Sequence, residues 1–284
     1  MQKLFYFLIL MMSAASVMAC TTWASIGAVN QHGGVLLVKN RDGSHHSREK
    51  LALVTPLHGY KYLGLIYNTT GSKATFPYIS AGINQYNLVV VNNAASTIPT
   101  THRDAGESKT MTTILAHYHS VAQVLKDQQK LFSTGLVNNL LIADPHRIAL
   151  VEIGKHGVYC VWSKTSGYLY HTNQFECKKL QTQNLHNYPD SLVRYQTIGD
   201  MLKTMKRPFT FDAFYSLTNR QQHGPNNSLF REWTDATWIV TMPKQGHVHL
   251  YVRFTDPIQR YHVYRITLTP GFWHQGKLAF MPSR

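Results

Sequence analysis

Blocks of short strand-like segments, separated by helical stretches, are the feature that most constrains the fold of this 284-residue chain. The segments are rich in β-branched and aromatic residues and are bounded by Gly, Asn and Asp, as β-strands and their turns are. They lie at residues 21–29, 33–42, 51–57, 62–68, 78–96, 138–173, 236–256 and 261–268. One turn is predicted at Asn84–Asn87.

Helical spacing of apolar residues occurs between these strand blocks. Residues 110–131 and 189–207 carry it, the second with apolar positions at Leu192, Tyr195, Ile198 and Leu202 and with Asp190 or Ser191 as N-cap. Residues 210–219 predict a short third helix. Strands grouped in hairpins between helices favour antiparallel sheets with helices on their outer faces. The expected class is a layered α+β domain, not a doubly wound parallel sheet.

The N-terminus has the layout of a secretory signal peptide. Lys3 supplies a positive start, residues 4–12 are apolar, and Val17 and Ala19 stand at positions −3 and −1 relative to Cys20. No later segment approaches the roughly 18 apolar residues of a membrane-spanning helix. We therefore expect a signal peptide at residues 1–19 and one domain at 20–284, secreted or periplasmic, without an integral membrane segment after cleavage.

The charge pattern and the motifs of the sequence argue against nucleic-acid binding, zinc binding and several enzyme classes. The net charge is +14, but the Lys and Arg residues are scattered and form no nucleic-acid signature, so the charge hints only at an anionic ligand. The 16 histidines lack the spacing of zinc ligands. No phosphate-binding, dinucleotide-binding, metalloprotease or serine-hydrolase motif occurs. No metal and no organic cofactor is expected, and the sequence leaves the oligomeric state open.

Three cysteines in an exported chain indicate one specialised thiol. Cys160 and Cys177 flank a predicted hairpin with its turn near Ser166–Gly167; that turn does not place them opposite each other, so their pairing stays open. Cys20 has three interpretations: a bystander, a lipid attachment site within SVMAC, or a nucleophile. Cleavage before Cys20 would free an α-amine with a pKa of about 7.7–8.0, which can accept the proton of the thiol on the same residue.

The segment from CTTW to GGVLLVKNRD resembles the start of the cysteine N-terminal-nucleophile (Ntn) amide hydrolases. That superfamily includes choloylglycine hydrolases, penicillin V acylases, acid ceramidase-like enzymes and acyl-coenzyme A:6-aminopenicillanate acyltransferase-like proteins. The resemblance implies a four-layer αββα fold with Cys20 as nucleophile. It assigns Asp42, in Asn40-Arg41-Asp42, to holding the amine of Cys20.

Three further motifs follow in the family's order. AGINQYNLVVVNNA is similar to a hairpin that precedes an oxyanion-hole residue, here Asn92 or Asn93. HTNQF resembles a motif whose Asn, here Asn173, supports the oxyanion, and NSLFRE nominates Arg231 as the active-site arginine. Lys39 stands where many bile-salt-type members have Arg, which leaves its role open.

Each of these positions also has a purely structural interpretation. Asp42 could be a turn residue before Gly43, Asn92–Asn93 the end of a strand, Asn173 a turn residue, and Arg231 a surface arginine.

The resemblance implies an exported hydrolase of linear amides that forms an acyl-thioester on Cys20. Two alternatives remain: an acyltransferase of the same family, and a lipid-anchored binding protein acylated on Cys20. The expected partner is a small N-acyl amide, with an anionic one favoured slightly by the charge. Conjugated bile acids, penicillin V, acyl homoserine lactones, N-acyl amino acids and ceramides all fit this chemistry.

Overall fold

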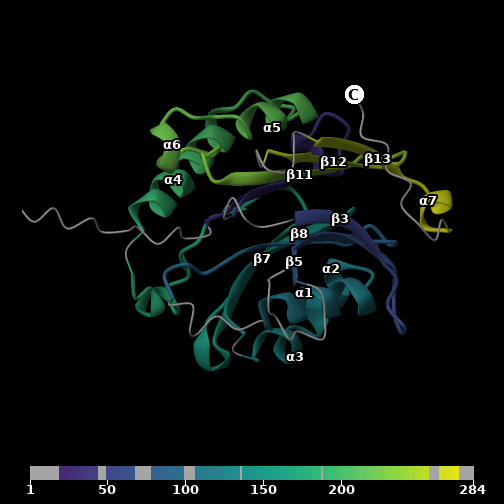
Figure 1. The fold of residues 1–284 in the computed structure, drawn as a ribbon, viewed down its shortest axis with the longest axis horizontal. Helices are drawn as coiled ribbons and strands as arrows, with labels where there is room; N and C mark the ends of the chain where they lie inside the picture. The colour runs from purple at the N-terminus through teal and green to yellow at the C-terminus, as the bar shows by residue number, and fades with distance from the viewer. Residues whose placement is uncertain are drawn as a thin grey trace, which may run out of the picture.

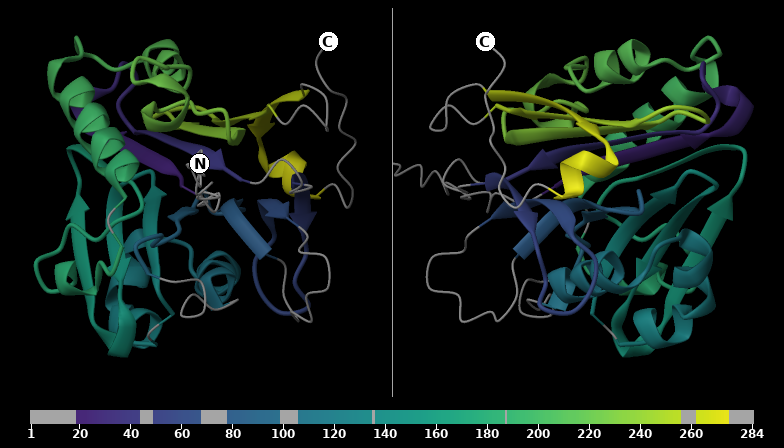
Figure 2. Two further views of the ribbon diagram at one scale, coloured as in Figure 1. Left: turned by 60° about the vertical axis from the view of Figure 1, so that its left-hand side comes forward. Right: turned by 90° about the vertical axis from the view of Figure 1, so that its right-hand side faces the viewer.

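Two antiparallel β-sheets lie face to face, with helices covering both outer faces (Figure 1). The computed structural model describes residues 19–43, 49–67, 78–98, 106–134, 136–186, 188–255 and 262–274. The predicted signal peptide therefore lies outside the described residues, except for Ala19. Figure 2 shows the same layers from two further directions.

A six-stranded sheet carries the N-terminal strands. Its order is β10-β1-β2-β11-β12-β13, and every neighbouring pair is antiparallel. The bounds are β1 (Thr21–Ile26), β2 (Val35–Asp42), β10 (Gly167–His171), β11 (Thr234–Met242), β12 (Val248–Phe254) and β13 (His262–Leu268).

A seven-stranded sheet follows chain order as a meander from β3 to β9. Its strands are β3 (Glu49–Val54), β4 (Tyr62–Tyr67), β5 (Tyr78–Asn84), β6 (Val89–Asn93), β7 (Asn138–Asp144), β8 (Arg147–Ile153) and β9 (Tyr159–Lys164). The predicted turn at Asn84–Asn87 is confirmed: Asn87 has φ 64°, which Asn tolerates better than most residues.

The helices form the outer layers. Over the seven-stranded sheet lie α1 (Gly106–His117), α2 (Val121–Lys126) and α3 (Gln128–Phe132); over the six-stranded sheet lie α4 (Pro189–Thr204), α5 (Phe211–Leu217) and α6 (Gly224–Asn227) (Figure 1). A short α7 (Pro270–His274) places Trp273 against the core between the sheets, and 3-10 turns lie at Gly27–Val29, Lys155–Gly157 and Gln181–Gln183. The predicted α+β sandwich is confirmed. No helix in the described ranges is long and apolar enough to cross a membrane.

The predicted helical regions are helical, but the division of the first region and the N-cap of α4 differ from the prediction. Residues 110–131 form parts of three short helices, because Ser120 caps α2 by accepting a hydrogen bond from the Gln123 N–H at 3.3 Å. In α4 the first residue is Pro189, which suits the first helical turn, so Asp190 and Ser191 lie inside the helix.

The predicted hairpin between Cys160 and Cys177 is wrong. Strand β9 pairs with β8 in one sheet, whereas β10 pairs with β1 in the other, so the chain changes sheets between them. Gly167 begins β10 with φ +101°, a conformation that glycine adopts readily. Cys160 and Cys177 nevertheless form a disulfide, which ties β9 to the segment after β10.

The inner faces of the two sheets change from apolar to polar at one end. Val35 and Leu37 belong to the core between the sheets, and the alternation of a strand places Lys39 and Arg41 on the same face. On β8, Ile148 and Leu150 are followed on that face by Glu152. A buried polar layer therefore closes this end of the sandwich.

Replacing Trp238 with Ala should lower the free energy of unfolding by about 3–5 kcal/mol, because it empties a site within the core between the sheets. Trp162, on the edge strand β9 and 38% exposed, is the matched control, and Trp162→Ala should cost under about 1 kcal/mol. Urea denaturation of both variants measures this. Similar losses would contradict the assignment of Trp238 to the core.

Candidate active site

Cys20 lies at the polar end of the sandwich, directly before β1. Its side chain is on the inner face, because Ala24 and Ile26 of the same strand belong to the core between the sheets. It is 3% exposed, and it is the one free thiol, since the other two cysteines form the disulfide. A buried reduced cysteine within a polar layer is suited to chemistry if a substrate can reach it.

Lys39 is the cation beside this thiol. It is fully buried on β2, where it lies opposite Thr22 of β1. Its ammonium donates a hydrogen bond to Oδ1 of Asn92 at 3.1 Å and another to the Asn92 carbonyl, and it also interacts with the Cys20 side chain. Burial lowers the pKa of Lys39 below 10.5, and the charge of Cys20 opposes that shift. A cation in this position can stabilise a thiolate.

Arg194 of α4 joins Cys20 to Asn173. Its guanidinium donates to the Cys20 carbonyl and to Thr21 Oγ1, each at 2.8 Å, and to Oδ1 of Asn173 at 3.0 Å. The side chain is fully buried. Burial lowers the pKa of Arg194, and the negative charge of Asp42 is the largest effect opposing this.

Asp42 ends β2 on the face toward the helices. Its carboxylate accepts hydrogen bonds from Thr234 Oγ1 at 2.7 Å and from Arg231 at 3.2 Å. Burial raises the pKa of Asp42 above 3.8, while Arg231 and Arg194 act to lower it. Arg231 also lies 3.5 Å from Asp190, which lies 3.3 Å from Arg194, so the charges alternate around the cluster.

The amide side chains of Asn93 and Asn173 connect β6 to β1 and the segment after β10 to Ala94. Asn93 Nδ2 donates to Thr22 Oγ1 at 2.8 Å, and Asn173 Nδ2 donates to the Ala94 carbonyl at 2.8 Å. Asn173 thus lies beside the segment that follows Asn92 and Asn93. The structure brings all six predicted residues together in one buried network: Cys20, Asp42, Asn92, Asn93, Asn173 and Arg231. Arg231 is 7% exposed and so is not a surface arginine.

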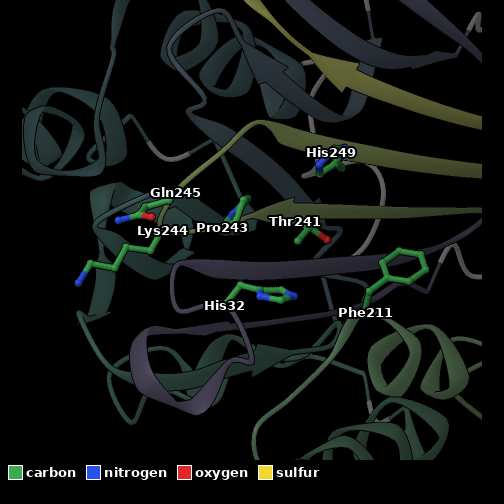
Figure 3. Close-up of a pocket in the computed structure, with 7 residues that line it drawn as sticks. All are labelled: His32, Phe211, Thr241, Pro243, Lys244, Gln245 and His249. Atoms are coloured by element: carbon green, nitrogen blue, oxygen red, sulfur yellow. The ribbon is translucent and has the colours of Figure 1, made fainter.

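One cavity lies away from this network. It has a volume of about 720 Å³ and is lined by His32, Phe211, Thr241, Pro243, Lys244, Gln245 and His249 (Figure 3). It adjoins the end of β11 where Met242 pairs with Val35, whereas Asp42 pairs with Thr234 at the other end. At roughly 3.3 Å per residue, the two ends of β2 are about 23 Å apart. All six predicted residues lie in the buried polar network, and none of them lines this cavity.

Comparison with known proteins gives the family. The sequence model of the acyl-coenzyme A:6-aminopenicillanic acid acyl-transferase family matches residues 29–255. The chain belongs to this family. The sequence matches none of the curated proteins at a significant level.

Solved structures agree on the fold of this acyl-transferase family member. Two variants of the conjugated bile acid hydrolase from Clostridium perfringens each superpose with a TM-score of 0.56 at 13% identity. The alignments cover 87% of this chain and 92% of the other. Family and fold together place the chain in the Ntn-hydrolase superfamily, as its motifs predicted.

Sequence reasoning missed one central residue of the site, Arg194. Its signal was present, because Arg194, Ile198 and Leu202 stand at intervals of four residues and all three are buried. The predicted apolar stripe began instead at Leu192, which is 41% exposed. A charged residue on the apolar stripe of a helix was the pattern that could have identified it. Within the described ranges, no group of three His, Cys, Asp or Glu side chains could hold a metal ion.

Replacing Lys39 with Met should lower turnover at least about tenfold while the protein still folds, because it removes the cation beside the thiol. Since the pKa of Lys39 is lower in the folded chain, the unfolded chain binds its proton more readily. The wild type should therefore lose stability relative to Lys39→Met as the pH falls from 10.5. Denaturation at pH 7 and 9.5 measures this shift. Lys50→Met, at an exposed position of β3, should keep wild-type turnover. A stability difference that moves the opposite way would contradict a lowered pKa of Lys39 in the folded chain.

Proposed function

We propose that this protein is an exported hydrolase of linear amide bonds, with Cys20 as its N-terminal nucleophile. One observation carries the proposal: the free thiol of Cys20 lies next to Lys39, and Arg194 ties its backbone to Asn173. Membership in an acyl-transferase family of the Ntn superfamily supports acyl chemistry at this thiol.

Before any reaction, the chain is cleaved between Ala19 and Cys20. The peptide nitrogen of Cys20 is not basic, whereas the freed α-amine has a pKa near 7.7–8.0 and is partly neutral at pH 7. This amine takes the proton from the thiol, and Lys39 stabilises the thiolate. Because Thr21 pairs with Asn40, the bond that is cleaved lies opposite the Arg41–Asp42 end of β2. This register supports a role for Asp42 in holding the amine.

The thiolate then attacks the amide carbonyl and forms a tetrahedral oxyanion. One N–H of Asn173 Nδ2 donates to Ala94, and the other donates to the oxyanion, together with a group of Asn92 or Asn93. As the C–N bond breaks, the α-ammonium gives its proton to the departing amine and an acyl-thioester remains on Cys20. Water attacks this thioester, loses a proton to the α-amine, and releases the carboxylic acid while the thiol is restored.

The other two functions use the same residue differently. If a second amine replaces water, the same thioester yields a new amide and the protein is an acyltransferase. A lipid anchor on Cys20 would require a diacylglyceryl group at a side chain that is 3% exposed and points between the sheets. That burial favours the nucleophile over the anchor.

The charge at the site supports one substrate class. Lys39 donates two hydrogen bonds to uncharged oxygens of Asn92 and interacts with the Cys20 side chain, and in the described part of the chain no carboxylate accepts a hydrogen bond from it. A small N-acyl amide that carries an anionic group is the substrate that this environment favours.

The purified exported protein should begin at an unmodified Cys20, as measured by intact mass. It should hydrolyse at least one member of a panel of conjugated bile acids, penicillin V, acyl homoserine lactones, N-acyl amino acids and ceramides. Cys20→Ser should lose about 10³-fold or more, because a hydroxyl is a much weaker nucleophile at this pH. Equal turnover by both proteins would refute the nucleophile, and a diacylglyceryl mass on Cys20 would establish the anchor instead.

Asp42→Asn should keep the fold and lose about 10²-fold or more of the activity, because the amide cannot hold the α-amine as a carboxylate does. A raised pKa means that the stability contributed by Asp42 is present in its protonated form and is lost as the pH rises through the folded-state value. Asparagine resembles that protonated form, so the free energy of unfolding at pH 7 should not fall. Asp212→Asn, at an exposed position of α5, is the control. An unchanged rate for Asp42→Asn would remove Asp42 from the mechanism.

A further inference from the structure

Glu152 is a fully buried carboxylate that the proposed mechanism does not use. It lies on β8 and points between the sheets, on the same face as Leu150. Its Oε1 accepts hydrogen bonds from His171 Nε2 and from the Glu176 N–H, both at 2.8 Å, and its Oε2 accepts one from the Cys177 N–H at 3.0 Å. All three donors belong to one short stretch, residues 171–177.

His171 completes the attachment at the start of that stretch. It is fully buried at the end of β10, where it pairs with Thr22 of β1. Its Nδ1 lies 2.8 Å from the Thr172 carbonyl, which can only accept, so Nδ1 carries a proton. Its Nε2 lies 2.8 Å from Oε1 of Glu152. The ring is therefore fixed at both nitrogens.

The disulfide fastens the other end of the same stretch. Cys177 is bonded to Cys160 of β9, and Cys160 is the residue opposite Glu152 in the β8–β9 pair. The carboxylate and the disulfide thus hold residues 171–177 to adjacent positions of the seven-stranded sheet. Asn173 lies inside this stretch, fully buried, with its side chain directed to Ala94 and Arg194.

We propose that Glu152 is a positioning residue that sets the place of the Asn173 amide at the oxyanion site. Glu152 touches none of the predicted catalytic groups and acts through His171 and the backbone of Glu176 and Cys177. The inference rests on the proposed function for its catalytic meaning, but the placement of the segment can be measured without turnover.

The decisive variant is Glu152→Gln, which keeps the size of the side chain. If the amide oxygen replaces Oε1, the NH₂ group faces the Cys177 N–H; if it replaces Oε2, the NH₂ group faces the Glu176 N–H. Either orientation sets a donor against a donor. We expect faster amide hydrogen exchange at residues 172–177 and a kcat about 10- to 100-fold lower at nearly unchanged KM, because an oxyanion donor acts in the transition state. Alkylation of Cys20 by iodoacetamide, which forms no oxyanion, should keep its rate.

Asp144→Asn is the matched control. Asp144 is also buried on the seven-stranded sheet and accepts three backbone hydrogen bonds, from Val121 at 2.6 Å, His146 at 2.7 Å and Arg147 at 2.8 Å. It ends β7 at the opposite end from Asn138 and Asn139. This variant should alter exchange near its own donors and leave both kcat and residues 172–177 unchanged.

His171→Phe provides a second test if Glu152→Gln does not fold, because it keeps an aromatic ring and removes both ring donors. It should reproduce the faster exchange and the lower kcat. Wild-type exchange at residues 172–177 in a folded variant, or equal losses of kcat in Glu152→Gln and Asp144→Asn, would overturn the inference. Faster exchange in a protein whose wild type hydrolyses no amide would support the placement by Glu152 and refute the proposed function.

Discussion

The buried guanidinium of Arg194 is the interaction on which the rest of the site depends. It reaches from a helix outside the six-stranded sheet to the Cys20 carbonyl, Thr21 and the side chain of Asn173. An arginine suits this position because its planar fork directs several donors in fixed directions. Three segments far apart in sequence, the start of β1, the stretch after β10 and helix α4, are thereby held in one arrangement. Asp42 and Asp190 offset the cost of burying the charge.

Burying a layer of polar side chains costs free energy unless these side chains form hydrogen bonds with one another. Here the register of the strands brings the partners together. Thr22 lies opposite Lys39 on one side and His171 on the other, while Asn93 donates to its hydroxyl. The apolar residues between the sheets exclude water up to this layer. Charges that face such a core interact more strongly than they would in water. The low polarity of the core therefore strengthens the attraction between the Lys39 ammonium and a thiolate on Cys20. The hydrogen bonds to Asn92 hold the Lys39 side chain in place.

The sequence was sufficient to predict the fold class and to single out six residues that meet in the buried polar network, because both depend on local patterns. Alternating strands predict sheets, and Cys20, Asp42 and Asn173 each stand within a short recognisable stretch. Contacts between distant segments were not predictable in this way. Helical periodicity alone did not distinguish the buried Arg194 from the exposed Leu192. The hairpin expected between Cys160 and Cys177 is wrong because strand pairing depends on contacts across the whole sandwich. Strand β10 pairs with β1, and β9 pairs with β8.

Cleavage before Cys20 would add a titratable α-amine to the cluster formed by Asp42, Arg194 and Arg231. The new α-amine would lie near the carboxylate of Asp42, whose negative charge favours the protonated form of the amine. The positive charges of Arg194 and Arg231 disfavour that form. The same two arginines lower the pKa of Asp42 against the effect of burial. One pair of cations therefore lowers the pKa of both groups: the arginines oppose the effect of burial on Asp42 and keep the amine from holding its proton too tightly. An amine that must accept a proton from the thiol and later return one to the leaving group needs this balance near neutral pH.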